Sequence, residues 1–197
     1  IKGNVVDPTQ LKITAVGCAD QEIPAYGDSY WQQQFQAFIT AFAEHIKQSS
    51  YKDIVQAVYL STGLSDESTP TVNQSGCAYK TTFVNDSTRM SAYNNYVLES
   101  LQWYKNAYQE GSGLAFPLFL QAAAASSNLR SRYSARAQQL GIGIKLNGLA
   151  PASENSFNTK VNYDAGGKGG FYDFVAMTPL TLPHGFEPYY WQTGPDN

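Results

Sequence analysis

The chain contains few charged residues, and this shortage excludes several classes of protein. Lys, Arg, Asp and Glu make up 15% of its 197 residues, and the net charge is -3. Ordinary soluble domains carry about 25% of these residues. No cluster of Lys and Arg is present, so the electrostatic footprint of a nucleic-acid-binding protein is missing. No apolar run approaches the roughly 18 residues that a membrane-spanning helix needs. We therefore expect neither a nucleic-acid partner nor a membrane span.

Cysteine and histidine are also scarce. The two cysteines are Cys18 and Cys77, and the two histidines are His45 and His184. Their spacing fits no structural zinc site, and we predict no metal and no organic cofactor. Both cysteines follow neighbouring predicted strands, at one end of the expected sheet. A Cys18–Cys77 disulfide is the favoured prediction, and two free thiols are the alternative.

Neutral polar and aromatic residues take the place of the charges. The chain has 14 Tyr, 10 Phe and 3 Trp, and 43% of its residues are hydrophobic, which is enough for a sizeable core. Two glycosylation sequons begin at Asn73 and Asn85, in a stretch predicted to be an exposed loop. Together with the low charge and the expected disulfide, they favour an extracellular, secreted protein. Because the sequence begins at Ile1 with no signal peptide, we expect that a leader was removed or that the chain is a fragment.

Hydrophobic periodicity predicts an alternation of strands and helices. The clearest helix starts at Asp28 or Ser29, ends near Gln48, and carries one apolar stripe. That stripe consists of Trp31, Phe35, Phe38, Ile39, Phe42 and Ile46. Further helices are predicted at 87–110 and 127–140, with a brief helical turn at 171–177. Strands are predicted at 11–16, 54–60, 114–120 and 142–147, and a last apolar segment lies at 180–186.

The repeated order of strand and helix, without hairpin signals, predicts a single α/β domain over residues 1–197. Its sheet would be parallel, with the helices outside it. The first strand, the helix at 28–48 and the strand at 54–60, which we expect to be buried on both faces, would form a βαβ unit. An open doubly wound sheet and a (β/α)₈ barrel both fit this pattern. A complete barrel needs about 250 residues, so a barrel would be incomplete here, with further segments or chains completing it.

Two carboxylates follow predicted strands and form the candidate catalytic pair. Glu67 lies on the loop after 54–60, and Glu187 lies among aromatic residues near the end of the last segment. Cleavage of a glycosidic bond needs two such groups, one to protonate the leaving oxygen and one to attack the anomeric carbon or activate water. Polar and aromatic residues near the same strand ends are the candidate sugar contacts. They are Asp20, Gln121, Asn147, Tyr189 and Trp191.

Four local phrases carry a family resemblance. They are Ile23-Pro24-Ala25-Tyr26, the Gly63-to-Glu67 loop, Gly141-Ile-Gly-Ile-Lys-Leu-Asn-Gly148 and Gly185-Phe-Glu-Pro188. With the order of elements, they resemble the (β/α)₈ glycoside hydrolases of the large retaining clan that includes β-galactosidases and cellulases. The resemblance implies an incomplete TIM-like barrel covering strands 3 to 7 and a carbohydrate substrate. It also implies Glu67 as acid/base at the end of strand four and Glu187 as nucleophile at the end of strand seven.

The chain departs from that clan at the acid/base position. The clan commonly has Asn before the acid/base glutamate, whereas this chain has Asp66, and Glu67 lies seven residues beyond Leu60. The expected activity is hydrolysis of a glycosidic bond with retention. The alternative is a non-catalytic, glycosidase-like extracellular component that binds carbohydrate or has a structural role.

Overall fold

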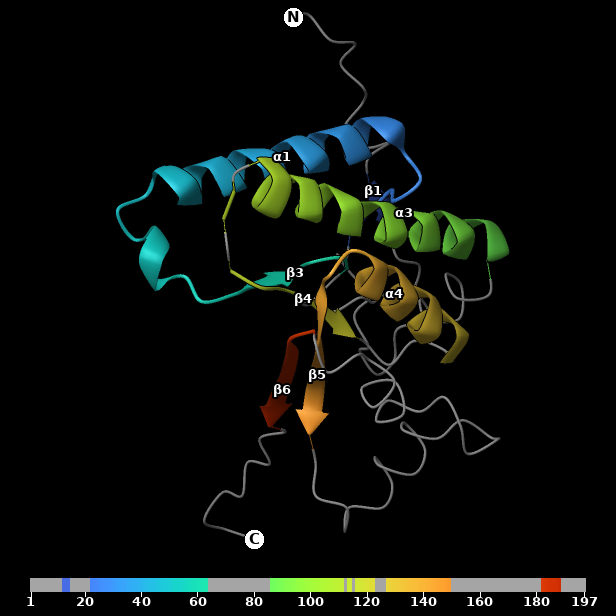
Figure 1. Cartoon of the computed structure of the whole chain (residues 1–197). Helices are drawn as coiled ribbons and strands as arrows, with labels where there is room; N and C mark the ends of the chain where they lie inside the picture. The colour runs from blue at the N-terminus through green and yellow to red at the C-terminus, as the bar shows by residue number, and fades with distance from the viewer. Residues whose placement is uncertain are drawn as a thin grey trace, which may run out of the picture.

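A computed structural model describes residues 12–14, 22–63, 86–111, 113–114, 116–122, 127–149 and 182–188 (Figure 1). The described elements, in chain order, are β1 (Lys12–Thr14), β2 (Glu22–Pro24), α1 (Ser29–Gln48), the 3₁₀ turn η2 (Lys52–Ile54), β3 (Val58–Leu60), α3 (Ser87–Lys105), the π-helical turn η3 (Asn106–Gly111), β4 (Leu118–Ala122), α4 (Ser127–Gln139), β5 (Gly143–Leu149) and β6 (His184–Pro188). None of the described helices is long and apolar enough to cross a membrane.

Four strands form a parallel sheet whose spatial order follows the chain. The order is β3-β4-β5-β6, and every neighbouring pair is parallel. Leu60 pairs with Leu120, Leu120 with Ile144, and Ile144 with His184. Each crossover therefore moves the chain in the same direction across the sheet. The prediction of an α/β domain with parallel βα repeats is confirmed.

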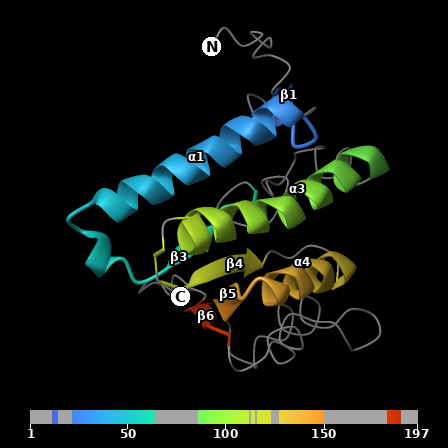
Figure 2. The same cartoon turned by 45° about the horizontal axis from the view of Figure 1, so that its top comes forward.

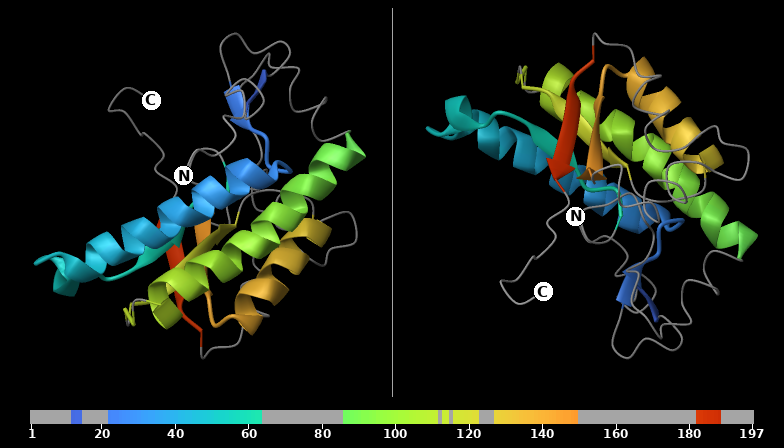
Figure 3. Two further views of the ribbon diagram at one scale, coloured as in Figure 1. Left: turned by 90° about the horizontal axis from the view of Figure 1, so that it is seen from above. Right: turned by 90° about the horizontal axis from the view of Figure 1, so that it is seen from below.

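All three long helices lie on the same side of this sheet. Seen from above, α1, α3 and α4 lie in front of the strands, and seen from below, β5 and β6 lie in front of the helices (Figure 3). Alternate strand residues turned toward the helices are fully buried, among them Leu60, Leu118, Leu120 and Ile144. The intervening positions Tyr59, Phe119, Gln121, Gly143 and Lys145 lie on the opposite side, which we call the far face.

The central helix α3 contributes more buried hydrophobic residues to the core than any other described element. One side of the helix is buried at Tyr93, Val97, Leu101 and Tyr104, and Tyr108 continues this side into η3. The side chain of Asp86 caps the helix by accepting hydrogen bonds from the backbone N–H groups of Thr88 and Arg89, both at 3.0 Å. α4 packs beside α3 (Figure 2). The Tyr133 hydroxyl of α4 donates a buried hydrogen bond to Asn94 Oδ1 of α3 at 2.5 Å.

α1 begins and ends where the sequence predicts, but only part of its apolar stripe is buried. Asp28 accepts a hydrogen bond of 2.8 Å from the backbone N–H of Trp31 and caps the helix. Ile39 is buried, whereas Phe38 and Phe42 are 60% and 47% exposed. The predicted apolar stripe is therefore only partly buried. α1 packs against α3 along one side, and part of the stripe lies outside that contact.

Three predictions about strands need correction. β1 pairs antiparallel with β2 in a separate two-stranded sheet, with Ile13 opposite Ile23, so the first predicted βαβ unit is wrong. The predicted strand 54–60 is shortened to β3, and Ile54 is 72% exposed, so this segment is not buried on both faces.

The strand predicted at 114–120 lies later in the chain, as β4, because Pro117 has no N–H to donate to a sheet. Instead, the Pro117 carbonyl accepts a hydrogen bond from the backbone N–H of Val58 at 3.0 Å, which leads β4 into register with β3.

The end of α4 is as predicted: Gly141 has a φ of 69°, in the left-handed region that glycine adopts without strain.

Buried tyrosines give the fold a dependence on alkaline pH. Burial raises the pKa of Tyr108 to about 12 and also raises the pKa values of Tyr96, Tyr104 and Tyr133 above the usual 10. The neutral phenols stabilise the fold fully below pH 10. Above pH 10 the unfolded chain releases these protons more readily, and each such tyrosine lowers the free energy of unfolding by about 1.4 kcal/mol per pH unit.

We therefore expect cooperative unfolding in base, beginning above pH 10. Phenolate absorbance and far-ultraviolet circular dichroism should change together in a titration from pH 8 to pH 13. Tyr108→Phe should move the midpoint to higher pH, whereas Tyr51→Phe should not, because Tyr51 is 69% exposed. Complete phenolate formation near pH 10 in a chain that keeps its helices would contradict this expectation.

Candidate active site at the carboxyl end of the sheet

Three of the predicted site residues lie in described strands at the same end of the sheet. Gln121 lies in β4, Asn147 in β5 and Glu187 in β6. The remaining predicted positions lie outside the described residues. They are the catalytic Glu67, the sugar contacts Asp20, Tyr189 and Trp191, the disulfide pair Cys18 and Cys77, and the glycosylation positions Asn73 and Asn85.

The parallel register brings Asn147 and Glu187 next to each other. Their Cα atoms are direct partners across β5 and β6, although 40 positions separate them in the chain. The register shifts directly after this pair, where Leu149 pairs with Pro188. Asn147 and Glu187 therefore form the last regular pair before an irregularity, at the carboxyl end of both strands. Irregular pairing at strand ends is common beside active sites.

Gln121 lies on the far face of the sheet. Its row of register partners precedes the Asn147–Glu187 pair by two residues along the strands. It pairs in register with Lys145, and Lys145 pairs with Gly185. The Gln121 side chain is buried, with 6% of its surface exposed. Because Asn147 follows Lys145 by two positions, the pair Asn147–Glu187 belongs to the same alternate set of strand positions as Gln121 and Lys145. Two consecutive rows on one face of the sheet thus contain three of the predicted residues.

Sequence reasoning placed Lys145 at a strand end but gave it no role, and it did not single out Tyr59. The Lys145 Nζ atom lies 4.6 Å from the centroid of the Tyr59 ring, in cation–π contact. This contact joins β5 to β3 across the intervening strand β4. The available signal was a single charged residue inside an otherwise apolar run, Ile142 to Leu146, but its importance depends on the strand register.

Beneath this contact, the far face is aromatic and closely packed. The Phe119 ring centroid lies 5.6 Å from that of Tyr59, and Phe119 is 8% exposed. A Cβ atom at Gly143 would lie 3.1 Å from the Phe119 ring and would collide with the carbonyl oxygen of Pro183. Glycine is therefore required at 143 by space rather than by backbone angle, and it lets the Phe119 ring approach the backbone of β5 closely.

The chain leaving β3 is anchored where it begins its path toward Glu67. The Tyr104 hydroxyl donates a hydrogen bond of 3.2 Å to the carbonyl oxygen of Ser61, and the next residue, Thr62, is fully buried. Because α3 holds Tyr104 in the core, this hydrogen bond fixes the exit of β3 relative to the helical layer.

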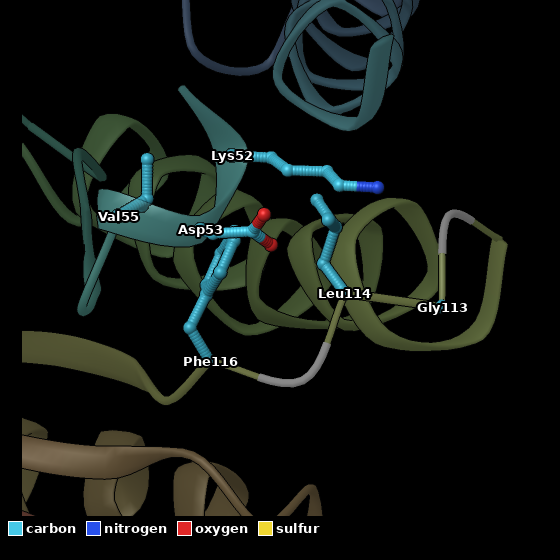
Figure 4. A pocket seen from close by; sticks show the side chains of 6 residues that line it. All are labelled: Lys52, Asp53, Val55, Gly113, Leu114 and Phe116. Carbon is cyan, nitrogen blue, oxygen red and sulfur yellow. The ribbon is translucent and has the colours of Figure 1, made fainter. Parts of the chain in front are cut away.

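A pocket of about 420 Å³ opens at the other end of the strands (Figure 4). It is lined by Lys52, Asp53, Val55, Gly113, Leu114 and Phe116, which precede β3 and β4. Figure 4 shows the Lys52 side chain extending over Leu114 toward Gly113. Chemistry in parallel α/β folds sits at the carboxyl ends of the strands. This pocket lies at the amino ends and contains no predicted site residue, so we do not place the active site there.

Comparisons of the chain with protein-family models, with curated proteins and with solved structures find no match.

Proposed function

We propose that the chain is a sector of a (β/α)₈ barrel that hydrolyses glycosidic bonds with retention of configuration. Glu67 is the acid/base and Glu187 is the nucleophile. The observation that carries this proposal is the position of Glu187 at the carboxyl end of the last parallel strand, in register with Asn147. This is where the retaining clan that the sequence resembles has its nucleophile.

The arrangement of the layers favours a barrel sector rather than an open doubly wound sheet. A doubly wound sheet reverses its strand order once and carries helices on both faces. Here the order β3-β4-β5-β6 runs in one direction, and α1, α3 and α4 lie on one side (Figure 3). In the proposed barrel these strands are numbers four to seven. The far face, with Gln121 and Lys145, is the inner surface.

The proposed reaction has two steps. The Glu187 carboxylate attacks the anomeric carbon while the bond to the leaving oxygen breaks, and the Glu67 carboxylic acid protonates that oxygen. Glu67, now ionised, takes a proton from water, and the oxygen of this water displaces Glu187 from the anomeric carbon. Retention requires the two carboxyl groups to lie about 5–5.5 Å apart. The reaction needs neither a metal nor an organic cofactor.

The neutral polar groups around this pair bind the sugar in the proposed complex. The amides of Gln121 and Asn147 bind hydroxyl groups, Asp20 adds a carboxylate, and Tyr189 and Trp191 pack against the sugar ring. The proposal includes secretion, a Cys18–Cys77 disulfide, and glycans at Asn73 and Asn85.

The test is the configuration of the first product. We expect the chain to release the aryl group from at least one member of a panel of aryl glycosides. Proton nuclear magnetic resonance of the first-formed sugar should then show the anomeric configuration of the substrate. An inverted first product would contradict the assignment of Glu187 as nucleophile.

One observation favours the second candidate function, a carbohydrate-binding protein without catalysis. Asp66 stands where the clan commonly has Asn, and a second acid beside Glu67 disfavours the ionisation of either. Saccharide binding in calorimetry, with no turnover of any aryl glycoside in the panel, would support this candidate over the hydrolase.

A further inference from the structure

One side of α1 carries aromatic rings that are open to solvent. Phe38 and Phe42 are more than 45% exposed, and His45 beyond them is exposed as well. Ile39 and Ala43, which directly follow the two phenylalanines in the chain, are buried. Successive positions of an α-helix lie about 100° apart around its axis, so the exposed rings lie beside the buried side of α1. Neighbouring exposed apolar side chains of this kind mark interaction sites.

The exposed rings belong to a continuous stack that begins in the core. The stack, which we call the aromatic row, consists of Trp31, Phe35, Phe38, Phe42 and His45. The Trp31 ring packs on the buried ring of Tyr96, with 5.1 Å between the centroids. From Trp31 onward, successive ring centroids are 5.2, 6.3, 6.0 and 6.5 Å apart. Rings that their neighbours already hold lose little rotamer freedom when a partner covers them.

The spacing of the aromatic row is that of a contact between two helices. Its members stand four, three, four and three positions apart, which is the period of 3.5 residues found where helices pair along their length. A second helix lying along α1 would therefore meet every ring of the row in turn. This pattern favours a helical occupant over a small molecule or an extended peptide.

The part of α1 that bears most of the row is uncharged. From Ser29 to Ala43 the helix contains no Lys, Arg, Asp or Glu, and the exposed positions near Phe38 include Gln34, Ala37 and Ala41. A charged partner would find no opposite charge here. A second copy of the chain suits this side well, because a symmetric contact brings the same surface of both copies together, where like charges would repel.

The aromatic row is also nearly symmetric about Phe38. Rings lie three and seven positions before Phe38, and four and seven positions after it. Two antiparallel copies of α1 that cross at Phe38 would place the two Phe38 rings together, with Phe35 of one copy beside Phe42 of the other. The same arrangement places the positive end of each helix dipole near the negative end of the other.

We propose that the aromatic row of α1 is a dimer interface, on which α1 of a second copy packs in antiparallel orientation about Phe38. Because the contact is a single helix pair, at the small end of specific interfaces, we expect a Kd in the micromolar range. The row belongs to the helical layer, on the other side of the sheet from the far face (Figure 3). The inference therefore does not depend on the proposed hydrolase function.

Sedimentation equilibrium of the full chain, from roughly 1 to 300 μM, tests the interface. The mass should rise with concentration from that of one chain to that of two. Phe38→Glu should raise Kd about 100-fold, because the dimer loses its central ring pair and brings two like charges together. Phe38 is 60% exposed, so circular dichroism of this variant should show the same helix content as the unmodified chain.

The matched control is Thr40→Glu, which adds the same charge to the same helix. Thr40 is exposed, lies about 160° around the helix from Phe38, and makes a hydrogen bond of 3.0 Å to the Gln36 carbonyl within α1. This variant should dimerise like the unmodified chain. Mixing the Phe38→Glu and Phe38→Lys chains should restore dimers that neither forms alone, because opposite charges then meet at the centre of the contact.

Three results overturn the proposal. A mass of one chain throughout the concentration range would exclude the second copy and assign the aromatic row to a different occupant, such as a helix of another protein. An equal Kd for the unmodified chain and Phe38→Glu would mean that the dimer uses another surface. A mixture of the two charged variants that stays monomeric would exclude the symmetric arrangement about Phe38.

Discussion

Glu187→Gln is expected to slow the release of aryl leaving groups by about 10⁴-fold, because an amide cannot attack the anomeric carbon. The loss should be similar for good and poor leaving groups, since no covalent intermediate forms with either. Steady-state rates on a series of aryl glycosides with leaving groups of different acidity would measure this.

Glu67→Gln should behave differently on the same series, because in the first step Glu67 assists departure of the leaving group and in the second it activates water. We expect kcat/KM to fall about 10²–10⁴-fold with poor leaving groups and much less with strongly acidic phenols, which leave without a proton. Glu44→Gln is the control, since Glu44 lies on α1 and pairs with Lys47. If Glu187→Gln kept substantial activity on all substrates, the assignment of the nucleophile would be wrong.

Leu101→Ala should lower the free energy of unfolding by about 3–5 kcal/mol. Leu101 is fully buried on α3, in the hydrophobic cluster that joins α1, α3 and the sheet. Removing three carbons there loses the burial of the side chain and leaves a cavity that rigid neighbours cannot close. For a chain of this size the melting temperature should fall by roughly 10 °C. Thermal and urea unfolding followed by circular dichroism would measure both quantities.

Leu98→Ala on the same helix is the matched control. Leu98 packs against the cluster but is only partly buried, so the same change of side chain should cost about 1 kcal/mol. Equal effects at both positions would mean that α3 does not pack on the sheet through the side that contains Leu101.

The helices of this fold could be predicted from the sequence because each has a strong local signal. Asp28 and Asp86 cap α1 and α3, and Gly141 follows the end of α4. A period of 3.6 residues in the apolar pattern then fixes the buried side of α3. The same pattern on α1 could not show how wide its contact with α3 is, so it did not reveal that Phe38 and Phe42 are exposed.

Strand pairing was harder to predict because it depends on distant partners. The β1 segment reads as a strand, but nothing local shows that it pairs with β2 rather than with β3. For the candidate site, the strand-end rule found Gln121, Asn147 and Glu187. It could not assign a role to Lys145, because only the register and the contact with Tyr59 across β4 reveal its place.

The order of the strands in the sheet has a consequence for synthesis on the ribosome. β4 pairs with β3, β5 with β4 and β6 with β5, so each strand emerges after the neighbour on which it can pair. The sheet can therefore grow by one strand at a time, in the direction of translation, with no strand waiting for a later one to separate it from its neighbour. α3 and α4 are made between successive strands and can cover the apolar face of the growing sheet before β6 arrives.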